Sequence, residues 1–115
     1  MSTTIFHNPR CSKSRATLEL LTKNQQEPEI IEYLKSPPSR DQLVTILDKL
    51  CMEPRDLMRT HEAPYKENNM DNPALQRDEL IDFMIQFPVL IERPIVIHQD
   101  KVAIGRPPEN ILKIL

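Results

Sequence analysis

The sequence predicts an α/β fold in which a mixed four-stranded sheet is flanked by helices and a helical insertion occupies the middle third. Short segments rich in β-branched residues stand near both ends of the chain, as expected of strands. The two N-terminal segments are separated by a helical pattern, and the middle third repeats apolar residues at helical spacing. The length of 115 residues suits one domain covering residues 1–115.

The N-terminal part is predicted to form a strand, a helix and a second strand. Residues 3–6 make the first strand, and Asn8-Pro9 signals a turn after it. A helix is expected over residues 12–24 and the second strand over residues 29–34. Two strands joined through a helix pair in parallel, with a right-handed crossover.

The middle third is predicted to be helical. After a proline-containing linker, Ser39 and Gln42 resemble a capping box at a helix start. The apolar stripe of the helix that follows consists of Leu43, Ile46, Leu47 and Leu50. Cys51 ends this helix on or beside its apolar face, and we expect it to be structural. Further helices are expected over residues 55–59 and 75–87, with a surface segment between them.

The C-terminal part is predicted to form an antiparallel hairpin and a helix. Residues 95–98 and 101–104 are apolar strands on either side of a tight turn. A helix over residues 109–115 would direct inward its apolar residues Ile111, Leu112 and Leu115. This order of elements is typical of the thioredoxin-like fold, which often holds a cis proline facing an active cysteine. Pro94, just before the third strand, stands at that position.

Composition excludes several classes of function. A net charge of −2 and a pI near 5.9 argue against nucleic acid as the main partner, because phosphate binding needs a basic surface. A single glycine, Gly105, rules out glycine-rich nucleotide-binding loops. The histidines and Cys11 lack zinc-ligand spacing, so neither a metal nor a tightly bound cofactor is expected. Two cysteines, no signal peptide and no membrane span predict a soluble cytoplasmic protein.

Cys11 is the strongest candidate for a catalytic residue. It falls at the predicted helix N-terminus, where unpaired backbone N–H groups and the helix dipole favour an anion. Arg10, Lys13 and Arg15 add positive charge nearby, and a protonated His7 would add more. A buried, inert cysteine in a capping turn is the alternative. The surrounding charge favours a reactive thiolate instead.

The spacing of Cys11 and Ser14 narrows the chemistry. Together they form a C-x-x-S motif, with serine where a redox C-x-x-C motif has its second thiol. The Ser14 hydroxyl could donate a hydrogen bond to the Cys11 sulfur but cannot close a disulfide. An oxidised Cys11 must therefore be released by a thiol from elsewhere, and glutathione is the simplest candidate.

Over essentially its whole length the sequence resembles the glutaredoxin-linked arsenate reductase family (ArsC-type), most closely a chromosomal, YfgD-like branch. The matching segments are His7-Asn8-Pro9-x-Cys11-Ser12-x-Ser14-Arg15, Tyr33-Leu34-x-x-Pro37-Pro38, Leu57-Met58-Arg59, Ile91-Glu92-Arg93-Pro94-Ile95-Val96 and Gly105-Arg106-Pro107. The resemblance implies a thioredoxin-like fold and reduction of arsenate to arsenite. It also implies glutathione as co-substrate and glutaredoxin as protein partner.

The same resemblance assigns roles to individual residues. Cys11 would be the nucleophile. The residues expected to hold the oxyanion are Arg59, Arg93 and Arg106. Forked guanidinium donors suit this task, because they neutralise a tetrahedral oxyanion and bind several of its oxygens. His7 would tune the electrostatics of Cys11, and Ser14 would bond to its thiolate. Supporting positions are Asn8, Arg15 and Pro94.

Three other functions are alternatives to a glutaredoxin-linked arsenate reductase. Phosphatase-like arsenate reductases need a C-x5-R loop and a relay of further cysteines, whereas this chain has C-x3-R and only Cys51 besides. A glutathione-dependent thiol oxidoreductase without arsenate activity would use Cys11 and Ser14 but leave the three arginines idle. An RNA-polymerase-binding regulator is known among wider relatives, which typically carry a C-x-x-C switch; Ser14 departs from that pattern.

Overall fold

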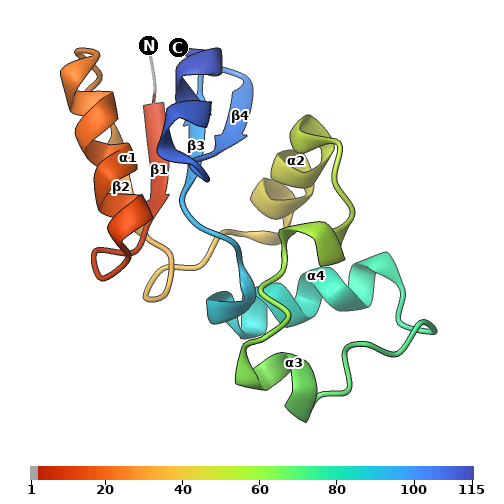
Figure 1. The fold of residues 1–115 in the computed structure, drawn as a ribbon. Helices are drawn as coiled ribbons and strands as arrows, with labels where there is room; N and C mark the ends of the chain where they lie inside the picture. Colours follow the sequence, from red (N-terminus) through yellow and green to blue (C-terminus); the bar gives the residue numbers. More distant parts are fainter. Residues whose placement is uncertain (1–2) are drawn as a thin grey trace. The chain divides into compact units, whose positions relative to one another are not determined.

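The computed structural model describes residues 3–115 and divides the chain into two compact units (Figure 1). The first, here called the sheet unit, comprises the chain up to Ser36 together with Arg93–Leu115. The second, the insertion unit, is Pro37–Glu92. The helical insertion predicted for the middle third is therefore confirmed, while one domain over residues 1–115 stays a prediction.

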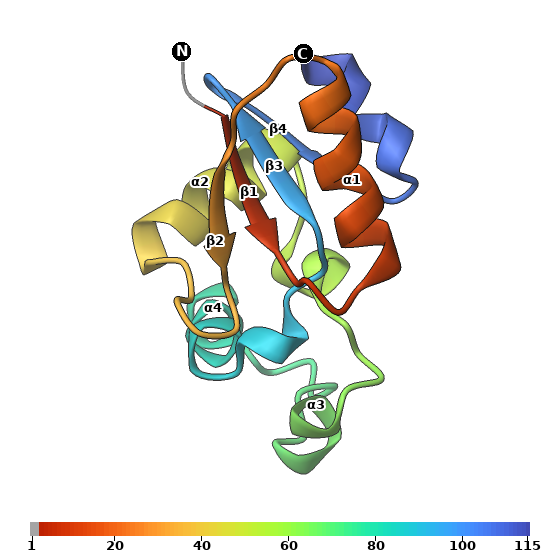
Figure 2. The same cartoon turned by 90° about the vertical axis from the view of Figure 1, so that its left-hand side faces the viewer.

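The sheet unit contains the predicted mixed sheet. Its elements are β1 (Thr3–His7), α1 (Ser12–Lys23), β2 (Glu29–Glu32), β3 (Ile95–His98), β4 (Lys101–Ile104) and the 3₁₀ helix η3 (Pro108–Ile114). The strand order is β2-β1-β3-β4, with β1 parallel to β2 and the other two pairs antiparallel. Figure 2 shows the four strands side by side, with α1 along one face. This is the thioredoxin-like arrangement that the sequence predicted.

A small apolar core joins this sheet to α1 and η3. Ile5 of β1, Leu21 of α1, Val96 of β3 and Ile111 of η3 pack together and are fully buried. In a strand, alternate side chains point to one face, and Ile5 and Val96 are paired neighbours on that face. The burial of these four side chains fixes α1 against the sheet, which in turn positions the first residue of the helix.

The C-terminal helix differs from the prediction. It is a 3₁₀ helix, in which residues three apart share a face, rather than an α-helix. Ile111 is buried and Ile114 packs against the core, whereas Leu112 and Leu115 are 43% and 38% exposed. The prediction that Leu112 and Leu115 point inward is therefore wrong.

In the rest of the sheet unit the ends of β1, α1 and β2 differ from the prediction by one or two residues, whereas β3 and β4 have the predicted bounds. The second strand ends at Glu32 rather than at residue 34, because the chain turns there and buries the Tyr33 side chain. Helix α1 ends at Lys23, with Asn24 as its C-cap. The peptide bonds before Pro94 and Pro107 are both cis.

The insertion unit is built from short helices around its own core. They are α2 (Arg40–Leu50), η1 (Pro54–Leu57), α3 (Ala63–Glu67), α4 (Arg77–Gln86) and η2 (Pro88–Leu90). Its buried apolar side chains include Leu43, Ile46, Leu47, Leu57, Leu80, Ile81, Met84 and Leu90. The capping box of Ser39 and Gln42 is present as predicted. The helix α3 was not predicted; it lies within the segment expected to cover the surface.

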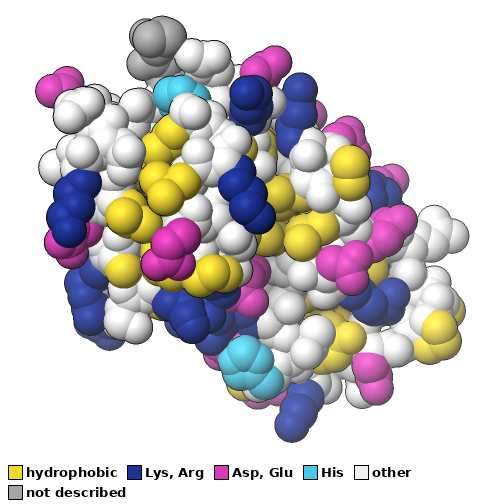
Figure 3. All heavy atoms as spheres, turned by 45° about the horizontal axis from the view of Figure 1, so that its top comes forward, with side chains coloured by type: hydrophobic (Ala, Val, Ile, Leu, Met, Phe, Trp, Pro, Cys, Tyr) yellow, Lys and Arg dark blue, Asp and Glu magenta, His cyan; other side chains and the backbone are white. Residues whose placement is uncertain are grey.

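Cys51 is the C-cap of α2 and adopts a left-handed backbone conformation with φ 56°. Its side chain is exposed, so it does not join the apolar face of the helix. Among residues 3–115, no helix combines the length and apolar character needed to cross a membrane. The face shown in Figure 3 carries both basic and acidic side chains among hydrophobic ones, so it is not a surface of one charge.

Candidate active site

The turn between β1 and α1 places Cys11 directly before the first residue of the helix. The Cys11 N–H donates to the carbonyl oxygen of Asn8 at 3.0 Å, and the Asn8 side chain accepts the N–H of Arg10 at 3.0 Å. The Cys11 carbonyl then accepts the N–H of Arg15 at 3.0 Å, which is the first bond of the helix. Cys11 is thus the N-cap of α1, as predicted.

The environment of Cys11 favours its thiolate. Burial alone would raise the pKa of this thiol. Hydrogen bonds from the backbone N–H groups of Ser14 and Lys13, and the hydrogen bond and positive charge of Arg93, outweigh burial. They hold the Cys11 pKa below its usual value. The sulfur stays half-buried rather than sealed off, so it can still meet a reactant.

Two arginines from the C-terminal segment of the sheet unit interact with this sulfur. Arg93 directly precedes Pro94 and β3, and Arg106 follows β4. An Nη2 group of Arg106 donates to Cys11 Sγ at 3.7 Å, while its Nε donates to the Arg93 carbonyl at 2.7 Å. That second bond fixes the direction of the Arg106 guanidinium. The structure therefore brings together three of the predicted site residues: Cys11, Arg93 and Arg106.

Tyr33 is a member of this cluster that the sequence analysis did not assign. Its side chain is almost fully buried and interacts with Arg93 by charge and by a hydrogen bond. Burial disfavours the charged guanidinium, but the interactions with Cys11 and Tyr33 leave the Arg93 pKa above its usual value. The signal in the sequence was Tyr33 within one of the matching segments.

Ser14, His7 and Asn8 form a second network behind the turn. The Ser14 hydroxyl accepts the Asn8 N–H at 3.0 Å and lies 2.6 Å from His7 Nδ1. Because burial lowers the His7 pKa, with Arg15 acting in the same direction and Glu32 opposing, a neutral His7 that accepts the hydroxyl proton fits this geometry. Ser14 donates a hydrogen bond to the Cys11 sulfur from its backbone N–H rather than from its hydroxyl, which is the donor predicted from the sequence.

The remaining predicted residues, Arg15 and Arg59, have other hydrogen-bond partners. Arg15 is exposed and donates to the Pro9 carbonyl at 2.9 Å, so it braces the turn. Arg59 belongs to the insertion unit, where its guanidinium donates to Glu62 and Glu92, each at 3.1 Å. Its role in holding an oxyanion stays a prediction.

Gly105 holds the end of β4 close to the site. Its N–H donates to the Pro94 carbonyl at 2.9 Å. A Cβ atom at this position would collide with Thr17 Oγ1 of α1 and would lie 2.8 Å from Pro94 Cγ. Glycine is therefore required for this close approach, which keeps Arg106 beside Cys11.

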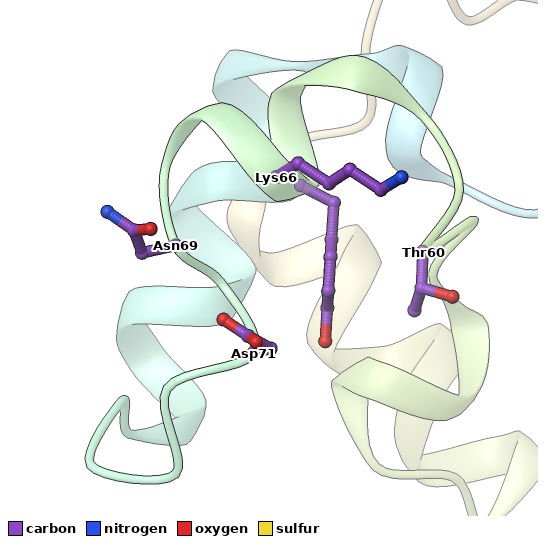
Figure 4. A pocket seen from close by; sticks show the side chains of 5 residues that line it. Thr60, Lys66, Asn69 and Asp71 are labelled. Carbon is purple, nitrogen blue, oxygen red and sulfur yellow. The ribbon is translucent and has the colours of Figure 1, made fainter.

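Two of the hollows in the described part of the chain lie in different units. One of about 460 Å³ lies beside the turn and is lined by residues 7–10 together with Glu32, Leu34 and Lys35. Another, of about 380 Å³, lies in the insertion unit and is lined by Thr60, Tyr65, Lys66, Asn69 and Asp71 (Figure 4). Within residues 3–115, no group of three or more His, Cys, Asp or Glu residues is placed to hold a metal ion.

The structure thus places a cysteine with a lowered pKa, close to two arginines and a cis proline, on a thioredoxin-like fold. The model of the ArsC family matches residues 6–114. The chain belongs to the ArsC family.

Individual relatives agree with this assignment. The arsenate reductase of Neisseria meningitidis serogroup B is 46% identical over 112 residues, covering 96% of both chains. The uncharacterized protein YfgD of Escherichia coli is 48% identical, covering 96% of this chain and 94% of YfgD. A solved arsenate reductase from Vibrio cholerae superposes with a TM-score of 0.96 at 45% identity, covering 100% of this chain and 98% of that one.

Proposed function

We propose that this protein is an arsenate reductase of the cytoplasm that uses Cys11 as its nucleophile and glutathione and glutaredoxin as its reductants. The observation that carries the proposal is the Cys11 sulfur held between helix N–H groups and the guanidinium groups of Arg93 and Arg106. The names of the relatives at 44–46% identity point to arsenate as the substrate.

The proposed role of the arginines is to reduce the electrostatic repulsion between the thiolate and arsenate. Near neutral pH arsenate is an anion, and a thiolate that attacks it brings like charges together. Arg93 and Arg106 would neutralise part of that charge and hold the oxygens with fixed donors. In the proposed role they also stabilise the charge that develops while an oxygen leaves as water. Arg59 is proposed as a third donor to the same oxyanion.

The electrons come from thiols. The Cys11 thiolate bonds to arsenic(V), and one arsenate oxygen takes up protons and leaves as water. Glutathione then attacks, so that two thiols become one disulfide and give two electrons to arsenic, which leaves as arsenite. Because Ser14 replaces the second thiol of a redox pair, the Cys11–glutathione disulfide needs glutaredoxin to open it.

The test is arsenate-dependent oxidation of NADPH in a mixture of this protein, glutathione, glutaredoxin and glutathione reductase. Turnover should require both arsenate and Cys11, and Cys11→Ser should abolish it while the protein stays folded. Arg93→Ala and Arg106→Ala should each lower kcat/KM for arsenate by about 10²-fold or more. Arg40→Ala is the matched control, because Arg40 pairs with Asp78 on the surface of the insertion unit. Equal effects of all three arginine variants would contradict the proposed oxyanion site.

A glutathione-dependent thiol oxidoreductase is the second candidate. The lowered pKa of Cys11 favours it equally, because a stable thiolate also speeds exchange with mixed disulfides. The two functions separate in the same assay. A protein of the second kind would form a Cys11–glutathione adduct, visible by mass spectrometry, and would reduce glutathionylated substrates without any response to arsenate.

A further inference from the structure

We propose that the hollow between the Cys11 turn and the end of β2 binds glutathione, the thiol reductant of the proposed function on which this inference rests. The hollow has a volume of about 460 Å³ and lies entirely within the sheet unit. Its walls are residues 7–10 of the turn on one side and Glu32, Leu34 and Lys35 on the other. We call it the β1–β2 hollow.

Its place in the fold suits a ligand that must reach Cys11. The parallel strands β1 and β2 end together, with His7 paired to Glu32, and Figure 2 shows both strands ending at one edge of the sheet. Ligands of parallel sheets bind in the crevice outside these carboxyl ends. Arg10 lines the hollow and is the chain neighbour of Cys11, with Cα atoms about 3.8 Å apart. A tripeptide seated here would lie against the turn that carries Cys11, and we propose that its central thiol reaches the Cys11 sulfur past Arg10.

The charges of the hollow match those of the ligand. Glutathione carries a carboxylate near each end, an ammonium group beside one of them, and the thiol in the middle. Arg10 and Lys35 offer two cations, and Glu32 offers an anion for the ammonium group. Leu34, which is 45% exposed, gives an apolar wall. A volume of about 460 Å³ also falls within the range of pockets for small ligands.

The ion pair between Glu32 and Lys35, which lies along one wall of the hollow, is easily exchanged. Lys35 Nζ lies 3.7 Å from Glu32 Oε1, and both side chains are largely exposed. Exposed pairs of this kind contribute little to stability. A ligand that offers a carboxylate to Lys35 and an ammonium group to Glu32 can replace this pair without leaving either charge alone.

The experiment is an NMR titration of the ¹⁵N-labelled protein with S-methylglutathione, whose blocked thiol prevents any redox reaction. We expect shifts of the amide signals of Asn8, Arg10 and residues 32–35. The double variant Arg10→Glu/Lys35→Glu should bind about tenfold more weakly, because two attractive pairs become repulsive. The matched control is Lys101→Glu/Lys113→Glu, which makes the same charge change at exposed positions on β4 and η3.

The outcomes separate this inference from the proposed function. Shifts confined to other residues, no binding, or equal affinities of the two double variants would each overturn the assignment of the hollow. Arsenate turnover with an unchanged KM for glutathione in Arg10→Glu/Lys35→Glu would also overturn it, while leaving the reductase function intact. Binding in the hollow by a protein that does not reduce arsenate would support the inference and count against the function instead.

Discussion

At the scale of single residues, the reactivity of Cys11 depends on charge brought from the far end of the sequence. The helix N-terminus supplies N–H groups from Lys13 and Ser14, which any cysteine at this N-cap would receive. Arg93 supplies a formal positive charge, and Tyr33, in the turn after β2, interacts with the Arg93 side chain. The lowered pKa of Cys11 therefore has both a local and a long-range contribution.

Replacing Arg93 should expose that dependence. Arg93→Ala removes the hydrogen bond and the charge that lower the Cys11 pKa, so this pKa should rise. Alkylation of the thiol by iodoacetamide, measured between pH 5 and 9, should then reach its half-maximal rate at a higher pH. Arg93→Lys keeps the charge and should restore much of the shift, whereas Arg40→Ala should leave the profile unchanged. An unaltered profile in Arg93→Ala would show that helix N–H groups alone activate Cys11.

His7 should make the folded protein sensitive to mild acid. Its pKa is below the usual 6.5 when folded, so the unfolded chain binds a proton more readily. The free energy of unfolding therefore falls as the pH drops below about 6.5 and continues to fall until the folded protein also titrates. His7→Asn keeps an acceptor near the Ser14 hydroxyl but cannot take up a proton. It should lose less stability between pH 7 and pH 5 than the wild type.

Urea unfolding at both pH values measures this difference. The control is His61→Asn, since the His61 side chain is 70% exposed and lies in the insertion unit. If His7→Asn and the wild type lost the same stability, the acid sensitivity would have to arise from other groups.

At the scale of elements, Gly105 links β4, the Pro94 turn and α1. Gly105→Ala would push a methyl group onto Thr17 and Pro94, and overpacking of this kind costs about 1–3 kcal/mol. Because Arg93 and Arg106 flank these contacts in sequence, the variant should also raise the Cys11 pKa. Thermal unfolding and the alkylation profile measure the two effects. Adding Thr17→Ala should recover part of the stability; no recovery would place the strain elsewhere.

The elements that the sequence predicted best are those with strong local patterns. The helix from Ser12 and the capping box at Ser39 carry start signals, and both begin where expected. The five-residue helix α3 has no apolar stripe and no buried residue, so nothing in the sequence separates it from a loop. The C-terminal segment was assigned the wrong helical period, and the period alone decides whether Ile114 or Leu115 faces the core.

The residues of the candidate site, like the helices and strands, could be predicted only where a local sequence pattern identifies them. Cys11 could be placed from the turn and helix signals around it. The hydroxyl of Ser14 was expected on the sulfur, but its partners His7 and Asn8 come from the end of the strand before it. The meeting of Tyr33 with Arg93 depends on how two distant segments pack, which no local pattern encodes. Resemblance to the family, rather than spacing, pointed to the arginines.

At the scale of the whole molecule, the sheet unit is discontinuous in sequence. β1 is central in the sheet and pairs with β3, which lies on the far side of the insertion. A fragment of residues 1–92 should therefore fail to form the sheet, because it lacks two of four strands as well as Val96 and Ile111 of the core. Limited proteolysis should cleave it rapidly within residues 3–36, where the full chain resists. Equal resistance of the fragment and the full chain would contradict this expectation.

The position of β3 in the sequence also determines when the sheet can form during translation. When the ribosome has made β1, the strand that completes its pairing is still roughly 90 residues away, which takes about 5–18 s to translate. During that interval β1 can pair only with β2, and the reactive thiol of Cys11 is present without Arg93 and Arg106. Until Arg93 is made, the nascent chain lacks the long-range contribution to the lowered pKa of Cys11, and the surroundings of this thiol are complete only once Arg106 has been added as well.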